Sequence, residues 1–455
     1  MPSKADGAEY LAYARRTVLN HIARFNVSSS TAATSGVRMY NGKRLHFEGN
    51  TFGGVEMSRS DILCGNGVLH LMKDVIPYSY NIREYIDVNS NTSMLSQFIK
   101  LFDEELFDVA NSTPLDVNEN GETIYDSVKI QYNRLLEYPY IGIGSVADED
   151  SIFTMIVPTD NAWAQAYAEM KPWFVNADDS IQDVQASLAV FSNLVFRKEV
   201  TDPGQYTGLK DLLVSTTGAE HTLIPSLFDG ATYIPASNGH IWLADQLNQQ
   251  ARESWNPDIE IESEASATRK TQTSTSYSGL QRTNNSSVRT YGVTPASEFA
   301  EQISEQNYIH VVSSSLDNAG VQFTLNGCLS GKYEIHAFFV PAVVDNPGAE
   351  EITKVSFAVT YPRAATGTRT QTTTFKDDSF VTSSDEMTEI VAGVVTFPVC
   401  NYIDPLRQMD ESYDASSYQS NFTLYVQTEV TQAEYNAGTY KREFRLDRVV
   451  LVPVI

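Results

Sequence analysis

The chain has 455 residues and a mass of 50.5 kDa, enough for roughly three domains at about 150 residues each. Its 42% apolar and 20% charged residues are typical of a globular protein and exclude wholesale disorder or a fibrous rod. The formal charge of −25, from 57 Asp and Glu against 32 Lys and Arg, excludes nucleic acid and anionic membrane surfaces as partners, because phosphates attract the opposite sign.

Targeting signals are scarce in this sequence. The longest apolar runs, such as Val449 to Ile455, stop after seven residues, whereas a membrane helix needs about 18 to 20. The first residues, from Met1 to Asp6, lack the apolar region of a secretory signal. A secretory signal is therefore either absent or was removed before this sequence begins, and localisation has to be inferred from other features.

The three cysteines are too few for a disulfide framework, and their spacings match no zinc or redox motif. Cys64 stands alone in the first half of the chain. Cys328 and Cys400 form either a single bridge or two small buried thiols, and the sequence leaves both alternatives open.

The first half of the chain alternates helical stretches with short strands. Apolar residues at helical spacing predict an amphipathic helix over residues 94–106 and another from Val184 to Val195. Between them, Ile152 to Pro158 is an apolar run that predicts a buried strand. The strand leads directly into a helix, for which Thr159 or Asp160 supplies the capping oxygen.

Two segments repeat one pattern 172 residues apart. Asn66-Gly67 and Asn238-Gly239 each stand between two apolar runs, and Asn and Gly both tolerate positive φ, so each pair predicts a β-hairpin. The distance is too long for a solenoid repeat. It is typical of two homologous domains.

The composition changes near residues 248–258. Residues 263–287 are rich in Ser, Thr and Asn and almost free of aliphatic side chains, which predicts a loop or an exposed edge. Alternating apolar residues then predict seven strands and no convincing helix, which is typical of a β-sandwich. The predicted strands are Tyr308–Val312, Val321–Leu325, Tyr333–Val340, Val355–Tyr361, Ile390–Phe397, Phe422–Thr428 and Phe444–Val454.

The junction between the buried strand and its helix carries a resemblance to a known family. The run Pro158-Thr159-Asp160-Asn161-Ala162-Trp163, followed by helices and then by Asn238-Gly239, resembles the fasciclin-type domain over about residues 90–250. Trp242 stands where the second box of that family has His, whereas Asp245 agrees with the family. The resemblance implies a β-wedge with helices and a role in adhesion, or in protein or glycan binding.

An incomplete copy of the same domain is predicted over residues 1–88. Val18 to Phe25 resembles the mid-domain helix and Asn66-Gly67 the second box, where His70 agrees with the family and Lys73 replaces its Asp. The first box and the opening helix have no counterpart. We therefore expect an apolar face on the predicted helix that a partner, the next domain or a missing segment covers.

The C-terminal region, residues 251–455, resembles the galactose-binding-like jelly-roll modules that often bind carbohydrate. The resemblance depends on the run from Gly331 to Phe338 and on the closing strand from Leu446 to Pro453. With residues 89–250 as the complete fasciclin-like domain, the predicted fold class is α+β with a C-terminal all-β sandwich. The whole arrangement resembles secreted or lipid-anchored surface proteins of Gram-negative gut bacteria.

Motifs for catalysis or metal binding are scarce. The seven histidines form no metal-spaced pair, and no nucleophile-elbow, phosphate-loop or zinc-protease pattern occurs. Gly142 to Ala147 matches a dinucleotide fingerprint loosely, but Asp148 to Asp150 would repel a pyrophosphate. Asp116 to Gly121 copies the opening of a calcium loop, but Ser127 replaces the bidentate Glu, so a hairpin tip is the simpler interpretation. We predict no enzyme, no cofactor and no metal.

The candidate binding residues are aromatic residues and one histidine. Trp255, in polar surroundings, and Tyr277, within the Ser/Thr tract, are the aromatics least easily assigned to a core, and sugar binding needs flat aromatic faces. His21 lies where vertebrate fasciclin-type domains use a Tyr-His pair for integrin contact, although the pair here reads Asn20-His21. For His70, which alternates with leucines on a strand, a structural role is the simpler interpretation.

The leading hypothesis is a non-enzymatic, exported cell-surface protein that binds a protein partner or a glycan. The alternative is an accessory glycan-capturing lipoprotein of a TonB-dependent outer-membrane importer, anchored through a lipid on a segment that this sequence does not include. A glycoside hydrolase that uses two carboxylates is a third hypothesis, because among 57 acidic residues some pair always looks suitable.

Overall fold

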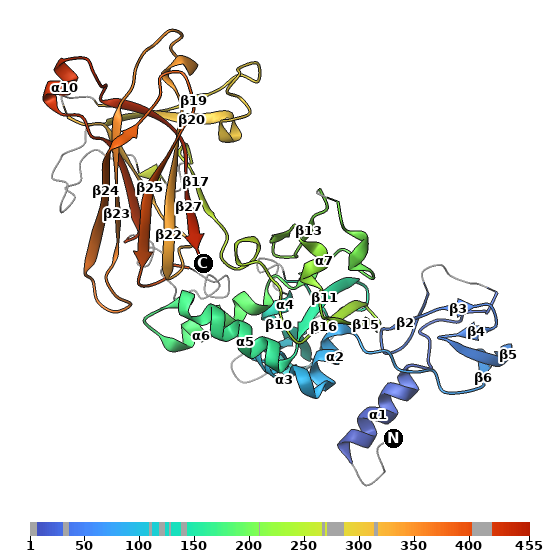
Figure 1. The fold of residues 1–455 in the computed structure, drawn as a ribbon. Helices are drawn as coiled ribbons and strands as arrows, with labels where there is room; N and C mark the ends of the chain where they lie inside the picture. Colours follow the sequence, from blue (N-terminus) through green and yellow to red (C-terminus); the bar gives the residue numbers. More distant parts are fainter. Residues whose placement is uncertain are drawn as a thin grey trace. The chain divides into compact units, whose positions relative to one another are not determined.

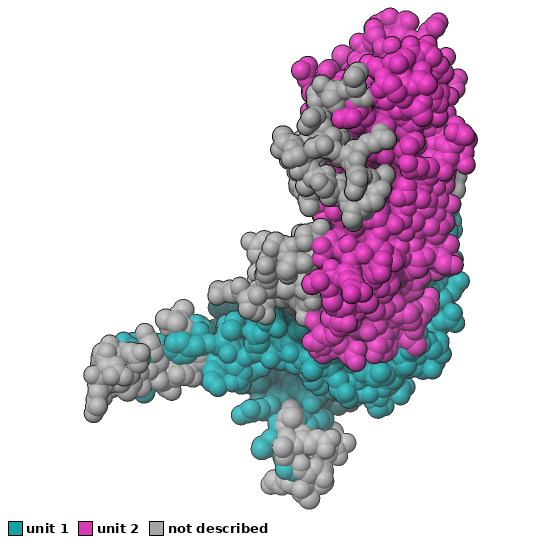
Figure 2. All heavy atoms as spheres, turned by 90° about the vertical axis from the view of Figure 1, so that its left-hand side faces the viewer, with its two compact units in different colours: residues 1–165, 192–248 teal, residues 166–191, 249–455 magenta. Residues whose placement is uncertain are grey.

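The structure, a computed structural model, describes residues 7–30, 36–108, 112–117, 123–126, 129–137, 143–208, 210–265, 269–270, 286–313, 317–402 and 421–455. It is 21% helical and 38% strand, which agrees with the predicted α+β class. The chain divides into two compact units, which Figure 2 shows in different colours: Met1–Gln165 with Ser192–Asn248, and Ala166–Phe191 with Gln249–Ile455. The break after Asn248 lies where the composition changes. A separate domain over residues 1–88 stays a prediction.

The first unit begins with one helix and a small antiparallel sheet, residues 7–76, which we call the N-terminal module (Figure 1). The sheet has the strand order β3-β4-β5-β6, and β1 pairs separately with β2. Its core holds Val37, Met39, Phe52, Met57 and Ile76. The elements are α1 (Ala8–Leu19), β1 (Val37–Arg38), β2 (Arg44–Leu45), β3 (Phe47–Glu48), β4 (Thr51–Phe52), β5 (Val55–Cys64) and β6 (Gly67–Met72).

The helix predicted from Val18 to Phe25 is wrong, because α1 ends at Leu19. Asn20 closes α1 as its C-cap, and the chain then turns so that Ala23 forms a bridge with Met39. Phe25 therefore lies outside any helix and is 77% exposed. The exposed apolar surface that we expected in this stretch is confirmed, although only Val18 of it lies on a helix, whereas Ile22 and Phe25 follow the end of α1.

The rest of the first unit is built on a mixed sheet with the strand order β12-β11-β16-β15. The predicted buried strand is confirmed, since every residue of β11 is buried, and β11 runs parallel to β16. Trp242, which replaces a family histidine, packs in the core, and its indole N–H donates to the carbonyl of Val200 at 2.9 Å. The elements are α2 (Ile82–Val88), η2 (Ser90–Thr92), α3 (Ser93–Lys100), β7 (Asp103–Phe107), β8 (Thr113–Val117), β9 (Thr123–Asp126), β10 (Lys129–Asn133), α4 (Arg134–Glu137), β11 (Phe153–Pro158), α5 (Asp160–Met170), β12 (Val195–Phe196), η4 (Pro203–Gln205), β13 (Leu213–Val214), β14 (Glu220–His221), α7 (Ile224–Leu227), β15 (Thr232–Ala236) and β16 (Gly239–Ala244).

Both predicted Asn-Gly hairpins are confirmed. In one, β5 and β6 pair with Cys64 opposite Gly67, and in the other β15 and β16 pair with Ala236 opposite Gly239. Gly239 has φ 140°, and a Cβ placed there would lie 1.9 Å from the carbonyl oxygen of Phe153. Only glycine allows β16 to approach β11 at this register.

Two predicted helices extend past the residues at which the observed helices end. The helix predicted over residues 94–106 ends at Lys100, and the chain continues as β7, which pairs with β10. The helix predicted from Val184 to Val195 is instead α6 (Asp179–Phe191), after which Val195 belongs to β12. In both places strand pairing with a distant segment overrides apolar spacing that continues past the helix end.

Thr159 and Asp160 cap two different helices. The Thr159 hydroxyl accepts the N–H of Ala162 at 3.4 Å and so caps α5, as predicted. The Asp160 carboxylate instead accepts the N–H of Met94 at 2.7 Å and the Ser93 hydroxyl at 2.5 Å. Asp160 therefore caps α3, a helix far away in the sequence.

The second unit contains a β-sandwich of two sheets (Figure 1). One sheet has the order β19-β20-β27-β22-β25 with β17 on β27, and the other has the order β18-β21-β26-β23-β24. All seven predicted strands are present, as β20, β21, β22, β23, β25, β26 and β27. The bounds are η3 (Lys171–Phe174), η5 (Ala251–Glu253), β17 (Ile259–Glu262), β18 (Arg269–Lys270), β19 (Ser286–Gly292), η6 (Ser304–Gln306), β20 (Asn307–Ser313), β21 (Gly320–Thr324), β22 (Gly331–Phe339), η7 (Ala342–Val344), β23 (Lys354–Pro362), β24 (Thr370–Val381), β25 (Thr388–Phe397), β26 (Thr423–Thr428), α10 (Gln432–Asn436) and β27 (Glu443–Val454).

Several elements of the sandwich were not predicted. Strand β24 is rich in Thr and lies at a sheet edge, where one face meets solvent, so its apolar alternation is weak. The prediction of no helix is wrong, because α10 forms at a capping box in which Thr431 and Glu434 satisfy each other's N–H groups.

The cysteines of the second unit form no disulfide. Cys328 and Cys400 are both buried and unbridged, which confirms the buried-thiol alternative. Burial raises the pKa of Cys328 well above its usual range, and the neighbouring Cys400 raises it further. Cys328 is therefore an inert thiol.

The segment around Trp173 explains why residues from the middle of the chain group with the sandwich. The N–H of Ser330 donates to the carbonyl of Trp173 at 2.7 Å, and the N–H of Cys400 donates to the carbonyl of Val175 at 3.0 Å. The Trp173 ring fills the place that a side chain at Gly331 would take, since a Cβ there would lie 2.3 Å from it.

Candidate functional site

The N-terminal module encloses an apolar pocket of about 240 Å³, which we call the module pocket. Strand β6 forms one wall, and the segment between α1 and β1 forms another. Part of its rim is exposed apolar surface, with Phe25 at 77% and Leu69 at 47% exposure. The lining residues are His21, Ala23, Phe25, Val27, Val37, Met39, Phe47, Phe52, Val68, Leu69, His70, Met72 and Ile76.

A bulge in the β5–β6 hairpin shapes this wall. Asp61 has φ 57°, and the register shifts between the pairs Arg59↔Leu71 and Ile62↔Leu69. The Ser29 hydroxyl, and then the Ser29 N–H at 2.8 Å, donate to the Asp61 carboxylate and lower the pKa of Asp61 to about 2. The carboxylate thereby holds the chain segment that forms the opposite wall.

His70 also connects the β5–β6 hairpin to the segment between α1 and β1. Its Nε2 donates to the carbonyl of Val27 at 3.0 Å, and its Nδ1 accepts the N–H of Asp61 at 3.4 Å. Both ring nitrogens are therefore engaged by the backbone, which is the structural role that the sequence favoured. The ring still borders the module pocket and adds a polar edge to it.

His21, which also lines the pocket, has a similar arrangement. Its Nδ1 donates to the carbonyl of Thr17 at 2.6 Å, and its Nε2 accepts the N–H of Ile76 at 3.0 Å. The residue is exposed, yet both ring nitrogens are occupied. His21 thus connects the end of α1 to the chain that leaves β6.

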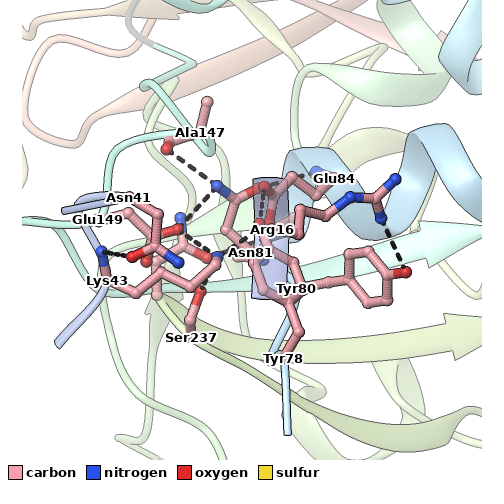
Figure 3. A network of polar contacts seen from close by, with 12 residues as sticks. Arg16, Asn41, Lys43, Tyr78, Tyr80, Asn81, Glu84, Ala147, Glu149 and Ser237 are labelled. Carbon is pink, nitrogen blue, oxygen red and sulfur yellow. Dashed lines mark hydrogen bonds and ion pairs between the residues drawn. The ribbon is translucent and has the colours of Figure 1, made fainter. Parts of the chain in front are cut away.

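A buried lysine fixes the module to the rest of the first unit (Figure 3). Lys43 is 1% exposed, and its Nζ lies 2.7 Å from Glu149, 2.9 Å from Glu84 and 2.9 Å from the Ser237 hydroxyl. The Tyr78 ring lies 4.7 Å from the same Nζ. The module is therefore held by ion pairs in which the Lys43 ammonium has little access to water.

Capping groups around Lys43 extend the network. Asn81 caps α2 by accepting the N–H of Glu84, and its amide donates to the Ala147 carbonyl and to Glu149 (Figure 3). Arg38 of β1 and Arg44 of β2 both pair with Asp150. Several elements of the first unit therefore hold the N-terminal module in place.

Among the described residues, the remaining predicted binding residue, Trp255, does not line this pocket. The view of Trp255 as an aromatic outside any core is wrong, since it is 8% exposed and its ring meets that of Trp173 at 5.7 Å. Tyr277 lies outside the described residues. The predicted calcium loop has its flanks paired as β8 and β9, which is a hairpin, and residues 118–122 at its tip lie outside the described residues.

The described surface of the sandwich offers few aromatic faces. Among its described aromatic residues Tyr435 is the exposed one, and the Arg442 guanidinium lies 4.9 Å from the centre of its ring. A second cavity of about 200 Å³ is bordered by small side chains, by Asn176 and Asn421, and by the buried Phe422. This cavity has no exposed ring against which a sugar could stack.

The described residues contain neither a metal-binding cluster nor a membrane-spanning helix. In that part of the chain no group of three or more His, Cys, Asp or Glu side chains is arranged to hold a metal ion. No helix within the described ranges is long and apolar enough to cross a membrane.

Sequence reasoning missed several residues that define this site. Phe25 was assigned to a helix, and Lys43 resembles any surface lysine in the sequence. The apolar run that contains Leu69 and Leu71 did predict a strand, but it could not show that both side chains are exposed.

Comparisons with known proteins assign no family. No protein-family profile and no curated protein sequence matches this chain.

Solved structures match the chain only weakly. A GH26-CBM35 β-(1,4)-mannanase from Podospora anserina is 12% identical with a TM-score of 0.21, over 44% of this chain and 28% of its own. A FAS1 domain pair from the insect cell adhesion molecule fasciclin I is 13% identical with a TM-score of 0.22, over 53% and 82%. A CBM35 from Paenibacillus barcinonensis is 9% identical with a TM-score of 0.18, over 37% and 94%. The chain spans less than a third of the length of the mannanase. These neighbours include the two kinds of module that the sequence resembles, but TM-scores near 0.2 carry no argument about function.

Proposed function

We propose that the protein is a non-enzymatic binding protein whose module pocket receives an apolar group of a protein partner. The observation that supports this is an open apolar pocket of about 240 Å³ whose rim exposes Phe25 and Leu69 to solvent. Contiguous exposed apolar surface of this kind typically marks an interaction site. Covering these two side chains would contribute up to about 1.5 to 3 kcal/mol for each.

The pocket is tested with prodan, a neutral dye whose emission shifts to the blue in apolar surroundings. The full chain should bind prodan, and Leu69→Asp should weaken binding at least tenfold because it places a charge on the rim. Leu101→Asp is the matched control, since Leu101 is 70% exposed but lies at the end of α3, outside the module. Equal binding by all three proteins would place the dye elsewhere and contradict the proposal.

A glycan ligand of the sandwich is a second proposal, based on the sequence resemblance. Trp255 is buried, so Tyr277 and the tract around it are the remaining candidates for that ligand. A glycan array probed with the full chain and with Tyr277→Ala tests this, and an array without any hit would contradict it. Export to a cell surface, a lipid anchor and association with a TonB-dependent importer likewise stay predictions.

A further inference from the structure

We infer that Asn326, which follows strand β21, is a site of spontaneous deamidation. In this reaction the backbone nitrogen of Gly327 attacks the side-chain amide of Asn326. The inference goes beyond the proposed function and is independent of it, because it concerns a covalent change in the sandwich. It is supported by the contrast between Asn326 and the other Asn-Gly pairs of the chain.

The sequence contains five Asn-Gly pairs. Glycine after asparagine favours deamidation, because no Cβ hinders the attacking nitrogen. The pair Asn120-Gly121 lies outside the described residues. The same dipeptide therefore occurs in four described environments, and the fold decides which of them reacts. The four asparagines are Asn41, Asn66, Asn238 and Asn326.

At Asn326 both reacting groups are accessible. Asn326 is exposed, and Gly327 follows it with φ 76°. Within the described part of the chain no hydrogen bond engages the Asn326 side chain or the Gly327 N–H. A Cβ placed at Gly327 would meet no atom within 4 Å, so the space around this peptide is open. The nitrogen can therefore approach the side-chain amide without first breaking another contact.

Asn238 is the least accessible of the four asparagines. It is 1% exposed, and its side-chain oxygen accepts the N–H of Ile82 at 2.9 Å. Its side-chain nitrogen donates to the carbonyl of Val146 at 2.8 Å and to that of Asp148 at 3.0 Å. Attack on this amide would have to break these hydrogen bonds first, which requires local opening of the first unit.

Asn41 and Asn66 are restrained through the glycine that follows each of them. The N–H of Gly42 already donates to a backbone carbonyl at 3.0 Å. Asn66 is exposed, but Gly67 belongs to β6 and pairs with Cys64 of β5, so strand pairing restrains its peptide. We therefore expect Asn66 to react more slowly than Asn326, and Asn41 and Asn238 to be the slowest.

The reaction needs water and no oxidant. The Gly327 nitrogen bonds to the side-chain carbonyl carbon of Asn326, and its proton leaves with the amide nitrogen as ammonia. One water molecule then opens the resulting succinimide ring. Opening at the side-chain carbonyl gives an aspartate, whereas opening at the main-chain carbonyl gives an isoaspartate, in which the main chain runs through the former side chain.

An isoaspartate would disturb the anchor of this segment. Asn401 is buried, and its side chain donates to the carbonyl of Leu325 at 2.5 Å and accepts the N–H of Cys328 at 2.7 Å. These two hydrogen bonds hold the chain on either side of Asn326 and Gly327. An isoaspartate adds one carbon to the main chain between them, a length of about 1.5 Å. At least one of the two hydrogen bonds should therefore be lost.

The test follows the described Asn-Gly pairs in one sample of the full chain. The protein is incubated at mildly alkaline pH in water enriched in oxygen-18, and the pairs are mapped by peptide mass spectrometry. Asn326 should incorporate the label about tenfold or more faster than Asn41 and Asn238, which react only after local opening. The same chain unfolded in urea is the control, and there the four pairs should react at similar rates.

Asn326→Gln is the matched variant, because its longer side chain would have to close a six-membered ring. It should remove the label from this peptide and keep its melting temperature during incubation. The wild type should lose about 2 to 4 °C as isoaspartate accumulates, which is the scale of one lost hydrogen bond in a unit of this size. Asn326→Asp carries the new charge without the extra main-chain carbon and should melt like fresh wild type.

Two results would overturn the inference. If Asn326 stays unlabelled in the folded chain, or if Asn41, Asn66 or Asn238 is labelled as fast, the fold does not select this site. If labelled wild type contains isoaspartate at Asn326 and still melts like fresh protein, the predicted loss of the Asn401 anchor is wrong.

Discussion

Asp447 is a buried carboxyl group in the middle of the sandwich. It lies on β27 and is fully buried, and its carboxylate accepts the N–H of Ser304 at 3.0 Å and a guanidinium N–H of Arg448 at 2.7 Å. Burial raises the pKa of Asp447 from 3.8 to about 7. Arg448 opposes this shift, while Glu262 and Glu264 add to it. The native state therefore favours the protonated form of this residue.

This shift predicts how stability depends on pH. Because the pKa of the folded state lies above that of the unfolded state, the contribution of Asp447 is fully present below about pH 4 and is lost as pH rises through 7. Asp447→Asn removes the titrating group, so the variant should gain on the order of 4 kcal/mol relative to wild type between pH 4 and pH 8, at about 1.36 kcal/mol per pH unit. Urea unfolding at both pH values measures this, with the exposed Asp245→Asn as control. A difference that stays constant with pH would contradict the prediction.

Lys43 provides a second prediction at the residue scale. Lys43→Met should lower the free energy of unfolding by about 3 to 5 kcal/mol, because it leaves Glu149 and Glu84 without their buried counter-charge. Adding Glu149→Gln should restore part of the loss, and a double-mutant cycle gives the coupling. Lys73→Met breaks an exposed pair and should cost no more than about 1 kcal/mol. Equal losses for the two lysine variants would show that the buried network is not stabilising.

Helix capping links two elements that are distant in the sequence. Asp160→Ala should cost about 1 kcal/mol and should speed hydrogen exchange at the start of α3, because it frees the N–H of Met94. Thr159→Ala should instead speed exchange at the start of α5, where the N–H of Ala162 loses its acceptor. Exchange followed by mass spectrometry separates the two helices. If Asp160→Ala loosened α5 and left α3 unchanged, the assignment of this cap would be wrong.

At the scale of the whole molecule, the connection of the N-terminal module predicts the effect of truncation. Deleting residues 1–77 should leave a folded but less stable chain, since it removes Lys43 and keeps α2. Deleting residues 1–88 should unfold the rest of the first unit, because Ile82 and Ile86 of α2 are fully buried and the N–H of Ile82 donates to Asn238 at 2.9 Å. Calorimetry of both truncated chains measures this. Identical melting of the two would show that α2 is dispensable.

The sequence by itself determined the local elements that depend on neighbouring residues. Alternating apolar residues specified seven strands of the sandwich, and the pairs Asn66-Gly67 and Asn238-Gly239 specified two hairpins. The run from Phe153 to Pro158 specified a buried strand. These signals are readable because side-chain period and turn chemistry act over a few residues.

The tertiary structure alone decided which distant groups meet. Helix α3 ends at Lys100 because the following residues pair with β10, and Asp160 serves α3 because the fold brings the two together. Lys43 is buried only because Glu84 and Glu149 converge on it from segments far apart in the sequence. The module pocket has the same origin, since contacts between distant segments depend on the sum of packing and charge over the whole unit, which no local pattern encodes.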